Sequence, residues 1–72
     1  MEKKVFDSLR NSWKSAFVAR GKVEEFSGGI LNPRGMANAD CAGIGPEGRI
    51  KIGRKVAYTV EALIAYMESR VV

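Results

Sequence analysis

The spacing of hydrophobic residues changes along the chain from a helical to an alternating period. Over residues 4–19, apolar side chains recur at steps of three and four, which predicts an amphipathic helix with Gly21 as its expected end. The stripe consists of Val5, Phe6, Leu9, Trp13, Ala16 and Phe17. From Arg49 to Tyr58 apolar and charged residues alternate, which is typical of a β-hairpin. We therefore expect an N-terminal helix and a hairpin in the C-terminal half.

Between these two stretches, the pattern predicts two short helices joined by a tight connection. Residues 22–27 place Val23 and Phe26 on one side, and the pair Gly28-Gly29 leaves the backbone too free to continue the helix. The sequence therefore predicts a helix that ends directly before these two glycines.

Asn32 and Pro33 are typical of a new helix start. Asn can accept a hydrogen bond from an unpaired backbone N–H, and Pro is preorganised for the first helical position. We expect this helix to span about residues 33–42, closed by Gly43 in a left-handed conformation.

The hairpin over residues 49–58 has an apolar set and a basic set. We expect the apolar set to pack inward and the cations to line the outer face. Gly53 as the first residue of a two-residue loop suits a type II′ turn, and a three-residue loop over 53–55 is the alternative. The apolar set is Ile50, Ile52, Val56 and Tyr58.

A last helix follows the hairpin, with Thr59 as a suitable N-cap. Its stripe consists of Val60, Leu63, Ile64 and Met67. Since the chain has 72 residues, two domains would each be too small to bury a useful core. We expect one domain over 1–72, mostly α with a small β-hairpin, in which 1–19 form the N-terminal helix and 20–70 the body.

Positive charge is concentrated in the hairpin. The net charge is +4, and residues 48–59 hold four cations and no acid, while the other eight cations and eight acids cancel. The four are Arg49, Lys51, Arg54 and Lys55. Such a cluster is expected to attract a polyanion, and a solvated surface hairpin is the alternative.

Several chemistries are disfavoured by what the sequence lacks. There is no His and Cys41 is the only Cys, so neither a Cys/His zinc site nor an intrachain disulfide can form, and no His base could activate a nucleophile. Residues 43–48 match G-x-G-x-x-G, but a helix precedes and a strand follows, the reverse of a dinucleotide site. We expect a cytoplasmic non-enzyme without cofactor, metal or membrane contact.

Two residues of the helix over 33–42 have side chains suited to reading DNA bases. Arg34, Asn38 and Cys41 share one helix face, opposite Met36 and Ala39. Arg can pair with guanine edges and Asn with adenine edges in the major groove. We therefore predict Arg34 and Asn38 as base-reading residues; the alternative is that both are simply solvated.

The chain resembles the AlpA-like and phage-excisionase group of MerR-type winged helix-turn-helix DNA-binding proteins over about residues 20–70. The resemblance rests on ILNPRGMANAD (30–40), GIGP (43–46), RIKIGRKVAY (49–58) and LIAYMESR (63–70). It implies that residues 33–42 form the recognition helix and that the hairpin is the wing, with Lys51, Arg54 and Lys55 on phosphates and Tyr58 in the core. It also implies a phage or mobile-element regulator, either a transcriptional regulator or an excisionase-type factor, with double-stranded DNA as partner.

Other interpretations remain open at this stage. A protein-interaction module that keeps the fold but binds DNA weakly is favoured by the single cation, Arg34, within residues 33–42. A small RNA-binding protein ranks third, since the basic hairpin face carries no aromatic for stacking on single-stranded RNA. The N-terminal helix lies outside the resemblance. Its Trp13 and Phe17 either complete the core or form a seam with a protein partner or a second copy.

Overall fold

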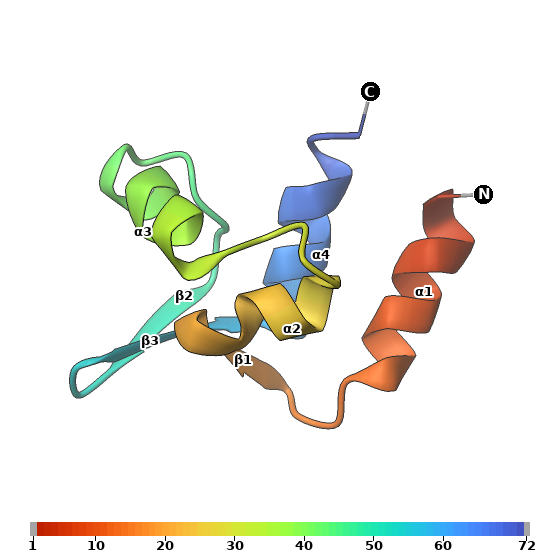
Figure 1. The fold of residues 1–72 in the computed structure, drawn as a ribbon, viewed down its shortest axis with the longest axis horizontal. Helices are drawn as coiled ribbons and strands as arrows, with labels where there is room; N and C mark the ends of the chain where they lie inside the picture. Colours follow the sequence, from red (N-terminus) through yellow and green to blue (C-terminus); the bar gives the residue numbers. More distant parts are fainter. Residues whose placement is uncertain (1, 72) are drawn as a thin grey trace.

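The computed structural model describes the backbone of residues 2–71 and the side chains of residues 6–71. Over this range it contains four α-helices, one short 3-10 helix and three strands (Figure 1). In chain order they are α1 (Glu2–Ser12), β1 (Phe17–Ala19), η1 (Arg20–Lys22), α2 (Val23–Ser27), α3 (Pro33–Cys41), β2 (Arg49–Ile52), β3 (Lys55–Thr59) and α4 (Val60–Glu68).

The first helix is shorter than its hydrophobic stripe predicts. It ends at Ser12, and Phe17 begins strand β1, which pairs with β3 and buries Val18 opposite Tyr58. The expected helix over 4–19 is therefore wrong over residues 13–19, and Gly21 lies in η1 rather than at a helix end. Pairing in the sheet and burial of Val18 outweigh the helical spacing.

Trp13 packs against the core from the connection between α1 and β1. Its indole Nε1 donates a hydrogen bond to the Phe17 carbonyl oxygen at 2.9 Å, and its ring meets the Phe26 ring edge-on, with centroids 5.2 Å apart. Phe17 itself remains 44% exposed. Of the two aromatic residues, Trp13 thus contributes to the core and Phe17 lies largely outside it.

The two short helices form as predicted. Helix α2 buries Val23 and Phe26 and ends at Gly28, which adopts φ 67°. At the start of α3, the Asn32 side chain accepts a hydrogen bond from the backbone N–H of Gly35 at 2.7 Å. Helix α3 ends at Cys41, one residue before the predicted end, and Gly43 has the expected left-handed conformation.

The predicted hairpin is part of a larger sheet. Its three antiparallel strands have the order β1-β3-β2. Ile52 pairs with Lys55, so the loop consists of Gly53 and Arg54. Gly53 has a positive φ of 62°, whereas Arg54 does not. This geometry fits the predicted type II′ turn.

The register corrects the predicted faces of the hairpin. Arg49 lies opposite Tyr58, and Lys51 lies opposite Val56, so each pair shares one face. Both isoleucines of β2 belong to the other face, where Ile52 is 62% exposed. Across a two-residue loop, even-numbered residues of β2 pair with odd-numbered residues of β3, so Ile50 and Ile52 cannot share a face with Tyr58. The predicted shared apolar face is therefore wrong.

The core lies between the Tyr58 face of the sheet and the helices. Thr59 caps α4 by accepting a hydrogen bond from the N–H of Ala62 at 3.0 Å, as predicted. One cluster of buried residues joins the elements: Val18, Val23, Phe26, Leu31, Met36, Tyr58, Val60, Leu63 and Ile64. The tip of the hairpin projects beyond this body, on the side away from α1 (Figure 1).

Candidate nucleic-acid interface

Helix α3 divides into a buried and an exposed face as its sequence predicts. Met36 and Ala39 are buried, whereas Arg34, Asn38 and Cys41 are exposed. The two predicted base-reading side chains are thus available to a ligand on the outer face of α3.

A buried carboxylate attaches α3 to the sheet. Asp40 Oδ2 accepts hydrogen bonds from Arg20 Nη2 at 2.6 Å and from the Tyr58 hydroxyl at 2.5 Å. Arg20 Nε also donates to the Tyr58 hydroxyl at 3.0 Å. The side chains of Arg20 and Asp40 are 27% and 5% exposed, so solvent screens this pair only weakly. The three side chains fix the orientation of α3 on η1 and β3.

The pKa values of this cluster follow from its contacts. Burial, then the hydrogen bond to Asp40, raises the pKa of Tyr58 above its ordinary value of 10.0. The hydrogen bond to Tyr58, followed by the contact with Asp40, raises the pKa of Arg20. Tyr58 therefore stays a neutral donor and Arg20 a cation at physiological pH.

Gly45 allows the loop after α3 to pass directly over the Asp40 carboxylate. A Cβ on Gly45 would overlap the Asp40 side chain and lie 3.2 Å from its backbone nitrogen. The glycine is therefore required by close approach. The sequence prediction missed Asp40, although its spacing of four from Met36 places it on the buried side of the helix.

The hairpin cations are divided between the two faces of the sheet. Arg49 and Lys51 share the face of Tyr58, the side on which α3 lies, and Arg49 Nη1 is 3.9 Å from Asp40 Oδ2. Lys55 pairs with Ile52 and belongs to the opposite face. All four hairpin cations are exposed.

A basic depression of about 380 Å³ lies between η1, the start of α3 and the hairpin turn. We call it the cationic pocket; its cations are Arg20, Lys22, Arg54 and Lys55, and Pro33 marks the first turn of α3 beside it. Of these four cations, Arg20 alone lies within 4.0 Å of a carboxylate among the side chains of residues 6–71. Lys22 was not predicted, because nothing in the sequence links the turn before α2 to the hairpin.

The predicted site residues therefore form two groups along α3. Arg54 and Lys55 lie near the start of α3, beside Pro33. Pro33 directly precedes Arg34 in the chain. Arg49 lies near Asp40, in the last turn of the helix. Exposed cations thus flank both ends of α3.

The described part of the chain contains no group of three or more His, Cys, Asp or Glu placed to hold a metal ion. It also has no helix with the length and apolar character needed to cross a membrane. No family model matches the chain, and neither a curated protein nor a solved structure matches it.

Proposed function

We propose that this chain is a double-stranded DNA-binding module of the winged helix-turn-helix type, with α1 as an added N-terminal helix. In this proposal α2 and α3 form the helix-turn-helix, and the β2–β3 hairpin is the wing. The observation that carries it is the cationic pocket, which joins the hairpin turn to the start of the helix that exposes Arg34 and Asn38.

The outer face of α3 has the chemistry for reading bases. A major groove about 12 Å wide admits one helix, and Arg and Asn match guanine and adenine edges there. The buried cluster of Asp40, Arg20 and Tyr58 supports this role because it holds the helix in one orientation.

The hairpin and η1 have the chemistry for phosphate contacts. Lys22, Arg54 and Lys55 carry charge without a described carboxylate partner, and Arg49 and Lys51 lie on the side of the sheet that faces α3. Cations on phosphates release condensed counterions, which gives affinity without base specificity. Base reading is then the task of Arg34 and Asn38.

The resemblance to AlpA-like and excisionase-type proteins supports a cytoplasmic role in phage or mobile-element regulation. Transcriptional control and recombination directionality use the same kind of DNA contact, so the proposal covers both.

A salt titration with duplex DNA tests the proposal. Replacing two phosphate-contacting cations in Arg54→Ala/Lys55→Ala should weaken binding to every duplex and reduce the slope of log affinity against log salt by about 2. Fluorescence anisotropy over a range of salt concentrations measures this slope.

Lys14→Glu is the matched control, because it lowers the net charge by the same amount at an exposed residue that does not line the cationic pocket. Its slope should stay close to that of the wild type. Equal slopes for the double variant and the wild type would place the hairpin turn away from DNA, and no binding by the wild type at low salt would reject the proposal.

A further inference from the structure

The C-terminal end of α4 carries a second surface, which shares no residue with the cationic pocket. Two neighbouring depressions, of about 320 and 350 Å³, are both lined by Tyr66 and Arg70. Together they define what we call the α4 surface; its principal residues are Ile30, Ile44, Tyr66, Met67, Arg70 and Val71.

Exposed hydrophobic side chains gather on the α4 surface. Five large apolar residues are prominently exposed among the described residues, and three of them lie here: Ile30 at 76%, Ile44 at 60% and Val71 at 45%. Ile30 and Val71 border the depression beside α1, and Ile44 borders the one beneath the loop after α3. A gathering of this kind is typical of a contact surface, whereas single exposed apolar residues are common.

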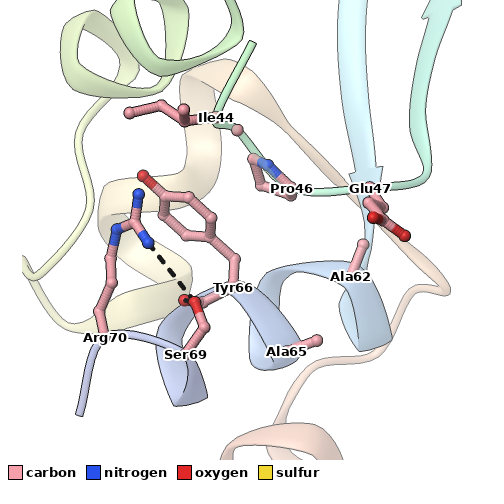
Figure 2. A pocket seen from close by; sticks show the side chains of 9 residues that line it. Ile44, Pro46, Glu47, Ala62, Ala65, Tyr66, Ser69 and Arg70 are labelled. Carbon is pink, nitrogen blue, oxygen red and sulfur yellow. Dashed lines mark hydrogen bonds between the residues drawn. The ribbon is translucent and has the colours of Figure 1, made fainter.

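Arg70 lines both depressions of this surface and lies over the ring of Tyr66. Its guanidinium carbon lies 4.1 Å from the centroid of the Tyr66 ring, and Nη1 donates one long hydrogen bond, 3.4 Å, to Ser69 Oγ (Figure 2). No carboxylate of residues 6–71 lies within 4.0 Å of it. Because a guanidinium has five N–H donors in a planar fork, Arg70 retains donors suited to a two-point contact with a carboxylate.

The surroundings of Arg70 favour a protein ligand over nucleic acid. Glu47 lines the same depression, so the lining residues carry no net positive charge. A phosphate backbone needs a cationic surface, whereas an Arg stacked on a Tyr among apolar side chains is typical of the centre of a protein interface.

We propose that the α4 surface binds a segment of another protein that places a carboxylate on Arg70 between apolar side chains. The apolar residues of that segment pack against Ile30, Ile44 and Val71. This site is separate from the proposed DNA interface, so a DNA-bound molecule could hold its partner at the same time.

Selection from a phage-displayed library of random peptides tests this proposal. Peptides selected on the wild-type protein should share an Asp or Glu flanked by apolar residues. Binding of the selected peptides should fall by about tenfold to hundredfold in Arg70→Gln, the loss expected for a charged hydrogen bond, and should also fall in Ile30→Ser. Arg70→Lys keeps the charge but not the fork, and it should restore only part of the binding.

The controls separate this surface from folding and from DNA binding. Ile52→Ser removes another exposed isoleucine, 62% exposed against 76% for Ile30, from the face of the sheet opposite Tyr58, and it should leave peptide binding unchanged. Arg70→Gln should retain the wild-type melting temperature and salt slope on DNA. Peptide binding and the melting temperature do not depend on DNA binding, so failure of the DNA proposal leaves the peptide test intact.

Three outcomes would overturn the proposal. The first is a selection that yields no shared acidic-apolar pattern, or peptides that bind Arg70→Gln as well as the wild type. The second is a DNA affinity and salt slope that fall in Arg70→Gln, which would assign the surface to nucleic acid. The third is a wild-type protein that dimerises in sedimentation experiments and loses the dimer in Arg70→Gln, which would make a second copy the occupant.

Discussion

The cationic pocket and the α4 surface both contain arginine, but the neighbours of each arginine differ. At the cationic pocket, Arg20 is largely buried and bound to Asp40, while Arg54 is exposed beside other cations. On the α4 surface, Arg70 is stacked on Tyr66 among exposed apolar side chains. From these neighbours we infer a different role for each arginine. Arg20 attaches α3 to the sheet, Arg54 contacts a polyanion, and Arg70 contacts a single carboxylate.

The comparison also explains why the two surfaces need not compete. On the α3 side, Asp40 is the only acid of residues 6–71 within 4.0 Å of a cation: its carboxylate binds Arg20 and lies 3.9 Å from Arg49. Lys22, Arg54 and Lys55 of the cationic pocket have no described carboxylate within 4.0 Å, so their charge stays available to a ligand. On the other side, one acid, Glu47, and one cation, Arg70, line the α4 surface, so a polyanion gains little by moving there.

Removing the Asp40 charge should have the largest effect on the α3 side. In Asp40→Asn, Arg20 loses its ion pair in a mostly buried site, so we expect a loss of about 3 kcal/mol in the free energy of unfolding. This value is at the lower end of the loss expected when a buried ion pair is broken, because the partly exposed Arg20 side chain can regain some hydration. Urea unfolding of the variant measures the change.

Glu24→Gln is the control for that experiment, because Glu24 is an exposed acid on α2 and its loss should change stability by less than about 0.5 kcal/mol. Equal effects of the two substitutions would mean that the Asp40 cluster does not hold α3. Peptide binding at the α4 surface by the folded fraction should be unaffected in either variant.

A smaller effect is expected on DNA recognition when Asn38 is truncated. Because Asn38 is exposed on α3, Asn38→Ala should leave the fold intact and relax discrimination at one base pair by about 1–3 kcal/mol. Binding to a panel of duplexes that differ at single positions measures this. Uniform weakening on every duplex would assign Asn38 to the DNA backbone rather than to a base.

Local chemistry in the sequence predicts much of the fold. Asn32, Gly28 and Gly43 mark helix ends correctly because each acts on backbone within a few residues of itself. Strand β1 was not predicted, since its pairing with β3 spans about forty positions and the same residues continue a helical stripe. The boundary of α1 is therefore decided by tertiary contacts.

The faces of the hairpin could have been derived from its own turn. Gly53-Arg54 as a two-residue loop fixes Lys51 opposite Val56, which by itself excludes a common face for both isoleucines of β2 and Tyr58. The Asp40 cluster and Lys22 are different, because Arg20, Asp40 and Tyr58 are separated by eighteen or more positions. Only the folded arrangement brings such residues together.

Amide chemical-shift mapping of the isotope-labelled protein with a mixed-sequence duplex tests the central claim most directly, because it locates the DNA on the molecule. We predict that the shifts concentrate on residues 20–22, 33–38 and 51–56 at low salt and fade as salt is raised, while residues 63–71 remain unchanged. Shifts confined to residues 63–71, or their absence from both α3 and the hairpin, would contradict the account.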